Sequence, residues 1–216
     1  MKKFFIAGTD TNIGKTYVTC QLLSYLNSEQ PQALAIKPVV SGAIEQDGKL
    51  IYQDVALLQQ HNAAQDLSIS NWYFKEQISP HIAAARNQMQ ISASEIVEYC
   101  NQPQFNHREY LFIEGAGGLM APLNQSETWL DVLSLSRIPV ILVVGMRLGC
   151  LNHSLLTAHA LQSNRISCVG WVANCVDPNM LEFQANLETL IHSLPWPLIA
   201  SVPFQGRITQ FISKIG

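Results

Sequence analysis

The sequence predicts an α/β protein with a doubly wound, mostly parallel sheet and helices on both of its faces. Short apolar runs, rich in β-branched residues, alternate with helix-like segments along the 216 residues. This alternation is typical of parallel sheets covered by helices. Hydrophobic residues make up 48% of the chain and charged residues only 13%, which favours strands buried on both faces and excludes a disordered chain. The length fits one domain over residues 1–216.

Six continuous apolar runs are expected to form the strands of this sheet. Runs of this kind, bounded by turn residues, suit strands whose two faces are both covered. They lie at Lys3–Ala7, Ala33–Val40, Tyr110–Glu114, Pro139–Gly145, Cys168–Asn174 and Leu198–Val202.

Six segments between the strands have the character of helices. Ser92 and Glu95 have the spacing of a capping box, and Asn152 or Ser154 is expected to cap the helix after Cys150. The helices are expected at Lys15–Asn27, Gln53–His61, Ser92–Cys100, Trp129–Ser136, Leu151–Gln162 and Met180–Ser193.

Two stretches are left outside this alternation. The interval Ala64–Gln90 is the least regular part of the chain and is expected to be a loop or a covering segment rather than core. Within it, the polar cluster Ser79-Pro80-His81 is expected to be a plain turn. The tail Gly206–Gly216 is left without a role.

Composition also limits the partners and the compartment. The formal net charge of −3 shows no basic excess, so no nucleic-acid partner is indicated. The five cysteines form no C-x-x-C pair, which argues against a disulfide framework or a zinc site and favours a reducing, cytoplasmic location. The first apolar run stops at Ala7, too early for a signal peptide or a membrane span.

The segment from Gly8 to Thr16 predicts a phosphate-binding loop. It follows an expected strand, opens an expected helix, and ends in Gly14-Lys15-Thr16, although five residues rather than four precede Gly14. Backbone N–H groups and the helix dipole of such a loop converge on phosphate oxygens. Lys15 is expected to contact the β- and γ-phosphates and Thr16 to coordinate Mg²⁺. The alternative, an ordinary turn with a capping threonine, is disfavoured by this context, and the fold is expected to be P-loop NTPase-like.

Two carboxylates are candidates to complete a magnesium site, because Mg²⁺ takes oxygen ligands. Glu114 ends an apolar strand, at the sheet edge where α/β ligand sites form, and precedes Gly115-Ala116-Gly117-Gly118. These glycines permit a close approach of backbone to a bound anion. Asp54 stands at an expected helix start, where a cap or first-turn acid is an equally good interpretation.

Lys37 is a third charged residue at the end of an apolar strand. A lysine there is costly unless its ammonium reaches solvent or an anion, and Pro38 then stops regular pairing. We therefore expect Lys37 to project into the same edge as the phosphate loop, with a snorkelling edge lysine as the alternative.

Taken in order, these motifs resemble those of ATP-dependent dethiobiotin synthetases, in which the longer glycine loop is usual. The matching segments are GTDTNIGKT at Gly8–Thr16, KPVVSG at Lys37–Gly42, the Asp54 region, SPH at Ser79–His81, EGAGG at Glu114–Gly118, PVILVVGMRLGCLNH at Pro139–His153 and GWVAN at Gly170–Asn174. The resemblance implies an ATP-dependent ligase that joins CO₂ to 7,8-diaminononanoate and closes the ureido ring, giving ADP and phosphate.

The resemblance also implies roles for individual residues. Catalysis is implied for Thr11, Lys15 and Lys37, and Mg²⁺ binding for Thr16, Asp54 and Glu114. Nucleotide contacts are implied for Asn12, Ile13, Gly14, Lys15, Thr16, Tyr17, Asp54, Glu114, Gly115, Ala116, Gly117, Asn174, Cys175, Pro203, Phe204 and Gln205. Substrate contacts are implied for Ser41 and for Gly149, Cys150, Leu151 and Asn152, a helix start that receives the substrate carboxylate across a homodimer interface.

Two positions depart from the family pattern. Asn12 stands where family members often carry glutamate, and Cys175 where they often carry aspartate. The first removes the carboxylate from that position, and the second is expected to loosen base selectivity.

Two other functions fit the sequence less well than the ligase does. A nucleotide-switched, partner-binding ATPase of the partitioning type shares the fold but carries an extra lysine near the start of its loop, and no lysine stands between Gly8 and Ile13. A regulatory domain without catalysis is disfavoured by the retained charged residues of the site.

Overall fold

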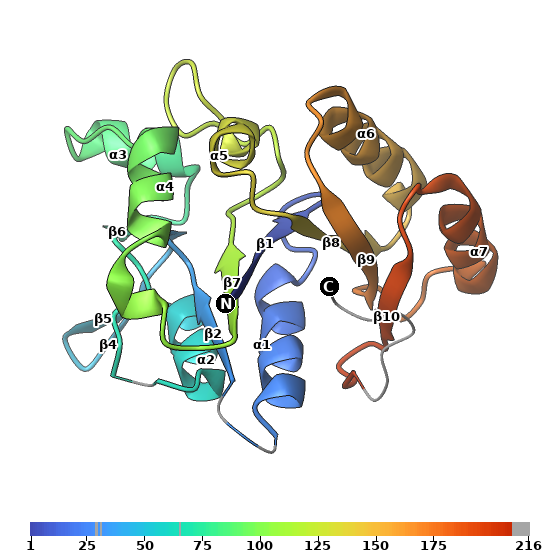
Figure 1. Ribbon diagram of the computed structural model, residues 1–216, viewed down its shortest axis with the longest axis horizontal. Helices are drawn as coiled ribbons and strands as arrows, with labels where there is room; N and C mark the ends of the chain where they lie inside the picture. Colours follow the sequence, from blue (N-terminus) through green and yellow to red (C-terminus); the bar gives the residue numbers. More distant parts are fainter. Residues whose placement is uncertain (29, 31, 65, 209–216) are drawn as a thin grey trace.

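Six parallel strands form the central sheet of the computed structural model, which describes residues 1–28, 30, 32–64 and 66–208 (Figure 1). The strand order is β10-β9-β8-β1-β7-β2, and all five pairings are parallel. The six strands are β1 (Lys2–Gly8), β2 (Ala33–Ile36), β7 (Tyr110–Glu114), β8 (Val140–Met146), β9 (Cys168–Cys175) and β10 (Leu198–Val202). Each expected apolar run contributes one of them, which confirms the predicted parallel sheet.

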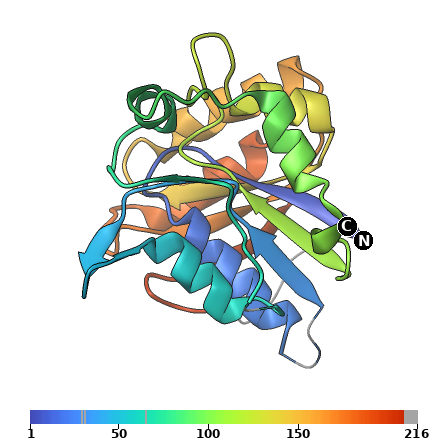
Figure 2. The ribbon, with the colours of Figure 1, turned by 90° about the vertical axis from the view of Figure 1, so that its left-hand side faces the viewer.

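Helices cover both faces of this sheet, as the sequence predicts. Figure 2 shows α1 (Lys15–Leu26) and α2 (Gln53–His61) on one face, and α4 (Ala93–Cys100), α5 (Trp129–Ser136) and α6 (Cys150–Ser163) on the other. The chain passes from β1 to β2 in one direction and from β7 through β8 to β10 in the opposite direction. Because parallel crossovers are right-handed, the two directions place their helices on opposite faces.

The crossovers leave the neighbouring strands β1 and β8 in opposite directions, so the connections after these strands diverge at their carboxyl ends. A point of this kind is where open α/β sheets bind ligands. All seven residues of β8 are buried, which explains why its sequence is a continuous apolar run. The topology therefore places the β1 and β8 loops together at the expected ligand edge.

The expected strand Ala33–Val40 is wrong as a single element. It divides at Lys37-Pro38 into β2, in the main sheet, and β3 (Val39–Ser41), which pairs with β6 (Trp72–Phe74) in a separate two-stranded sheet. Pro38 has no N–H to donate. Its carbonyl oxygen accepts hydrogen bonds from the backbone N–H groups of Asn71 and Trp72, at the start of β6. The chain thus changes partner where the proline interrupts the ladder.

The interval 64–90 is more ordered than expected. It contributes β6 and α3 (Pro80–Arg86), and several of its apolar residues belong to the core: Ile69, Trp72, Phe74, Ala83 and Ala84. Ser79-Pro80-His81 begins α3 rather than forming a plain turn, with Pro80 at the first helical position, where a proline costs no hydrogen bond. The expectation of a covering segment outside the core is therefore wrong for these residues.

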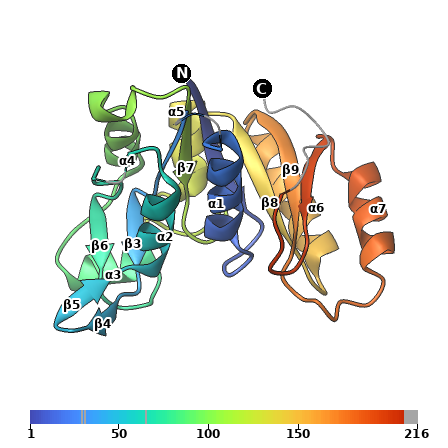
Figure 3. The ribbon, with the colours of Figure 1, turned by 90° about the horizontal axis from the view of Figure 1, so that it is seen from below.

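A hairpin of β4 (Ile44–Gln46) and β5 (Lys49–Ile51) is present in addition to the expected elements. Asp47 and Gly48 join its strands with φ of 51° and 72°, the positive values that two-residue hairpin turns require. Figure 3 shows the hairpin beside β3 and β6, on the side of the molecule away from α6 and α7 (Phe183–Ser193).

Helix caps are confirmed in part. Ser92 and Glu95 form the expected capping box at α4, and Thr128 and Asp131 form another at α5. The expected cap of α6 is wrong: Gly149 occupies that position in a left-handed conformation. The remaining short element is the 3₁₀ helix η1 (Pro103–Phe105). Among the described residues, no helix is long and apolar enough to span a membrane.

Candidate functional site

The loop between β1 and α1 has the geometry of an anion cradle. Gly14 precedes the helix with φ 80°, so α1 begins without a side-chain cap, and a Cβ at this position would lie 2.2 Å from Asn174 Nδ2. Asn12 also has a positive φ, 57°. Asparagine tolerates this left-handed conformation better than most residues, so its presence at a position where the family often has glutamate fits the backbone. The uncapped N–H groups of α1 remain available to a bound anion.

Lys15 folds back over this loop. Its Nζ donates to the carbonyl oxygens of Asp10, at 3.0 Å, and Gly117, at 2.7 Å. The absence of a side chain at Gly8 makes room for Lys15, because a Cβ there would lie 2.9 Å from Lys15 Nζ. Burial lowers the pKa of Lys15 to about 8, with Lys37 adding to this effect and nearby carboxylates opposing it. Lys15 therefore spans the two glycine loops, where it can meet the phosphates of a nucleotide.

Two predicted residues contact the fully buried carboxylate of Glu114 at the end of β7, and a third joins them through Lys37. Thr16 Oγ1 donates to Glu114 Oε1 at 2.6 Å, and Lys37 Nζ donates to the same oxygen at 2.8 Å. Lys37 also donates to Asp54, in the first turn of α2. Lys37 thus lies at the same sheet edge as the phosphate loop, as expected, and Asp54 is a first-turn acid of α2 whose carboxylate pairs with Lys37.

Lys37 is held as an ammonium in this cluster. Burial by itself would lower its pKa, but the charges and hydrogen bonds of Glu114 and Asp54 outweigh burial and raise the pKa above its ordinary value. Lys15 and Lys37 therefore differ, although both are buried, because only Lys37 is paired directly with carboxylates.

The cluster also has the donors for a magnesium ion. Thr16, Asp54 and Glu114 supply oxygen atoms, which Mg²⁺ prefers, and Glu114 Oε2 is buried without a hydrogen-bond partner. The described residues contain no group of three or more His, Cys, Asp or Glu side chains suited to a metal. A hydroxyl, two carboxylates and nucleotide oxygens fit Mg²⁺, which is usually held by few protein ligands, whereas zinc is not favoured.

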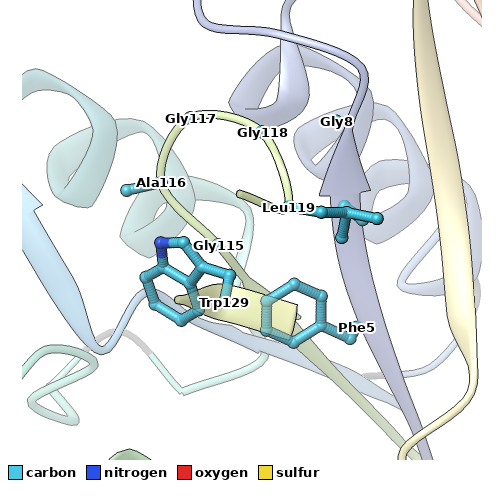
Figure 4. Close-up of a pocket in the computed structure, with 9 residues that line it drawn as sticks. Phe5, Gly8, Gly115, Ala116, Gly117, Gly118, Leu119 and Trp129 are labelled. Carbon is cyan, nitrogen blue, oxygen red and sulfur yellow. The ribbon is translucent and has the colours of Figure 1, made fainter. Parts of the chain in front are cut away.

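The second glycine loop, Gly115–Gly118, curves over the end of β1 (Figure 4). It lines a shallow hollow together with Phe5, Gly8 and Trp129. A Cβ on Gly115 would lie 2.7 Å from the Phe5 ring, and Gly117 has a positive φ of 70°. Glycine therefore fits both positions, because a Cβ would press on Phe5 of β1 at Gly115 and because the positive φ of Gly117 favours a residue without a Cβ.

Two of the predicted nucleotide-binding residues from distant segments, Asn174 and Tyr17, make contacts near the start of α1. Asn174 is buried at the end of β9, and its Nδ2 donates to Ile13 O at 2.8 Å. Tyr17 donates from its hydroxyl to the carbonyl of Gly206, in the turn that holds Pro203, Phe204 and Gln205 after β10. Cys175 follows Asn174, with its Sγ 3.5 Å from Asp177 O.

The predicted substrate residues lie at other points of the same edge. Ser41 ends β3, four residues after Lys37, and is partly exposed. Gly149, Cys150, Leu151 and Asn152 form the start of α6, which follows β8. Thr11 is exposed in the first loop, with its Oγ1 near Gly117.

One contact of the site was missed in the sequence. Arg147, after β8, pairs with Asp10 of the first loop, with 2.6 Å between Nη2 and Oδ2. The two residues are 137 positions apart, and no local pattern links them.

Comparison with known proteins places this site in a family. A family model described as AAA domain matches residues 2–210. Two proteins named ATP-dependent dethiobiotin synthetase BioD, from Legionella pneumophila strains Corby and Paris, are 47% and 46% identical over 210 residues, with 97% of each chain covered. The protein of the same name from Pseudoalteromonas translucida is 42% identical over 210 residues, covering 96% of this chain and 92% of its own.

Solved structures share the fold at much lower identity. The MinC:MinD cell division protein complex of Aquifex aeolicus matches with a TM-score of 0.56 and 13% identity, covering 94% of this chain and 81% of the other. A ParA family ATPase from Chlorobium tepidum matches with a TM-score of 0.55 and 12% identity, covering 94% and 83%. These likenesses confirm the P-loop NTPase-like fold and do not extend to function.

The two sets of matches thus separate the ligase from its partitioning-type rival. Sequence identity above 40% over nearly the whole chain is found with the synthetases, whereas a ParA family ATPase shares only the fold. The chain therefore belongs to the ATP-dependent dethiobiotin synthetase family.

Proposed function

We propose that this chain uses ATP to carboxylate 7,8-diaminononanoate with CO₂ and to close the ureido ring of dethiobiotin, a step of biotin biosynthesis. One amine of the substrate forms a carbamate with CO₂, a carbamate oxygen takes the γ-phosphoryl group, and the neighbouring amine attacks the mixed anhydride. ADP and phosphate leave. The observation that carries this proposal is the cluster in which Thr16 and Lys37 contact the buried carboxylate of Glu114 and Lys37 also pairs with Asp54, with Lys15 spanning the two glycine loops beside it.

The charges of this cluster suit phosphoryl transfer. The reaction spreads negative charge over the oxygens of the transferred group, and catalysis depends on positioning and electrostatic stabilisation. Lys15 approaches from the first loop, and the ammonium of Lys37 approaches from the end of β2. Two cations on different elements can therefore stabilise the transferring group from two sides, while Thr11 of the first loop lies near Gly117 of the second.

We propose that Thr16, Asp54 and Glu114 hold Mg²⁺ when the nucleotide binds. A bound Mg²⁺ would neutralise charge on the phosphates. In this structure the Lys37 ammonium contacts both carboxylates, which supports a preference of this pocket for positive charge. Glu114 Oε2, buried and unpartnered, is the oxygen best suited to accept the additional cation.

The nucleotide is proposed to lie across the loops, with backbone N–H groups of Asn12–Tyr17 and of Gly115–Gly117 at its phosphates. The base then falls near Asn174, Cys175 and the turn Pro203–Gln205. One N–H of the Asn174 amide is engaged with Ile13 O, so its other donor and its carbonyl remain for the base. Ser41 is proposed to contact the carbamate end of the substrate.

The far end of the substrate is proposed to reach the start of α6 in a second copy of the chain. Backbone N–H groups at a helix start suit a carboxylate, and Gly149–Asn152 supply such a start. Leu148 is 95% exposed and Leu156 is 62% exposed. Large apolar side chains gathered at one helix support an interface there, so we propose a homodimer. The five free cysteines support a cytoplasmic location.

A product assay tests the proposed reaction. Purified protein is incubated with ATP, Mg²⁺, labelled bicarbonate and the diamine, and the products are analysed by mass. We expect label in a cyclic urea and ADP release only when all four components are present. ATP turnover that ignores the diamine and rises with a protein or DNA partner would instead support the partitioning-type function.

A further inference from the structure

Asp10 and Arg147 link two loops to which the proposed function gives different substrates. Asp10 belongs to the loop between β1 and α1, and Arg147 belongs to the connection between β8 and α6. Their side chains approach to 2.6 Å, Nη2 to Oδ2. Neither residue has a role in the reaction as proposed above.

Asp10 organises the phosphate side of this pair. Its Oδ1 accepts from Thr11 N at 2.7 Å, while its carbonyl oxygen accepts from Lys15 Nζ at 3.0 Å. Because Oδ2 is held by Arg147, rotation of the Asp10 side chain is restrained, and with it the acceptor for the Thr11 backbone. The pair therefore fixes the residue that contacts both Thr11 and Lys15.

Arg147 organises the other side. Its carbonyl oxygen accepts from the N–H of Cys150, the first residue of α6, at 3.0 Å. His153, in the first turn of α6, places Nδ1 3.9 Å from the same Asp10 oxygen. The start of α6 is therefore linked to the phosphate loop through the side chain of Arg147 and, at longer range, through that of His153.

The packing between these segments adds to the link. Thr9 N donates to Val143 O, and a Cβ on Gly145 would lie 2.6 Å from Ile13 Cγ2. Residues 143, 145 and 147 therefore each contact the first loop, and the contact of Arg147 is an ion pair. Its side chain is 38% exposed and that of Asp10 is 40% exposed, and pairs of this exposure add little to global stability.

We propose that Asp10 and Arg147 are positioning residues of the ligase reaction. This inference rests on the proposed function. The pair holds Thr11 and Lys15 in a fixed position relative to the start of α6. The carbamate and phosphate groups bound by this chain then meet in a fixed geometry, while the start of its α6 is held in place for the substrate carboxylate of the second copy's site. Misplacement of reacting groups by a small distance lowers turnover strongly, so the pair acts on rate rather than on folding.

A double-mutant cycle tests this inference in the full-length protein. The variants are Arg147→Gln, Asp10→Asn, both together, and Arg147→Lys. Arg86→Gln is the matched control, because Arg86 forms an exposed pair with Glu76 on and near α3. The measurements are kcat and KM for the diamine, ADP binding in the presence of Mg²⁺, and the melting temperature.

Each single variant is expected to lose about tenfold in kcat/KM, and the double variant is also expected to lose about tenfold, because the two residues act through one contact. ADP affinity and melting temperature should stay close to wild type. Arg147→Lys should recover activity to within about threefold, since one ammonium can replace the single Nη2 contact. Arg86→Gln should match wild type.

Three outcomes would overturn the inference: single variants within about twofold of wild type, a double variant with the product of the single losses, about 100-fold, or activity losses that follow a lower melting temperature. A wild-type protein that forms no labelled cyclic urea would overturn the proposed function itself. The two failures are thus distinguished by the wild-type assay.

Discussion

Lys15 is a buried cation without a direct carboxylate partner, and this gives it a pH dependence. Its pKa is lowered to about 8, mainly by burial, so the free protein loses this charge as pH rises above about 8. We expect the affinity for ATP, measured without diamine, to fall by up to about tenfold per pH unit above that value. The unfolded chain binds this proton more tightly than the folded chain does. Lys15 therefore lowers the free energy of unfolding fully below about pH 8, and this destabilisation is relieved as pH rises toward the ordinary lysine pKa of 10.5.

Lys15→Arg is the control for this pH dependence. An arginine stays charged across the same range, so ATP affinity in this variant should be flat between pH 7.5 and about 9.5. A wild-type affinity that is equally flat would contradict the lowered pKa of Lys15.

Lys37 and Lys15 should give different phenotypes when truncated. Lys37→Ala is expected to retain the fold and nucleotide binding but to lose at least about tenfold in rate, equivalent to ~1.4 kcal/mol of transition-state stabilisation. It should also lower the free energy of unfolding by about 3 kcal/mol, because the buried Glu114 carboxylate loses its ammonium partner. Lys15→Ala should instead weaken both nucleotide binding and turnover.

Calorimetric titration with ADP and steady-state rates separate the two lysines. An unchanged rate in Lys37→Ala would remove this residue from the catalytic set. Wild-type ADP affinity in Lys15→Ala would contradict a phosphate contact by Lys15.

At the scale of the elements, the helix ends contain removable strain. Arg137 closes α5 in the left-handed region with φ 56° and donates its N–H to Leu133 O. Glycine adopts this conformation without the steric cost of a Cβ. We expect Arg137→Gly to raise the free energy of unfolding by about 0.5–1 kcal/mol, seen as a higher denaturant midpoint with an unchanged slope. Arg137→Ala keeps the Cβ and should show no gain; an equal gain would mean that the backbone is not the cause.

Elements with strong local patterns were predictable from the sequence. β7, β10, α2 and α5 have the bounds that the sequence predicts: the two strands are short apolar runs, and α5 begins at a capping box. The missed hairpin has strands of only three residues, mostly exposed. Its Asp47-Gly48 turn was the signal that would have found it.

The residues of the site were also predictable only where a local pattern marks them. Lys15, Thr16, Lys37 and Glu114 were predictable because each stands in a motif or ends an apolar strand with an otherwise costly charge. The Asp10–Arg147 pair was not, because it depends on β1 and β8 being neighbours in the sheet, which neither local segment encodes. Pro38 was identified as an interruption, but the change of sheet after it depends on the partner β6.

At the scale of the whole molecule, the topology places the start of α6 at the ligand edge with exposed apolar side chains beside it. Leu148, Leu155 and Leu156 are 95%, 44% and 62% exposed, although burying such side chains is worth about 1.5–3 kcal/mol each. The proposed homodimer would cover them and would bring Gly149–Asn152 of one copy to the substrate of the other. This assembly predicts that substrate affinity depends on association.

Leu156→Glu tests this dependence. A charge on a side chain that is already exposed should leave the folded monomer intact but oppose its burial between two copies. We expect the variant to elute at half the wild-type mass, to keep its ADP affinity, and to raise KM for the diamine by about tenfold or more, a loss of ~1.4 kcal/mol in binding. Leu57→Glu, on α2 across the sheet and 45% exposed, is the matched control and should remain dimeric. A monomeric Leu156→Glu variant with wild-type KM would show that one chain holds the whole diamine by itself, and a monomeric wild type would contradict the dimer directly.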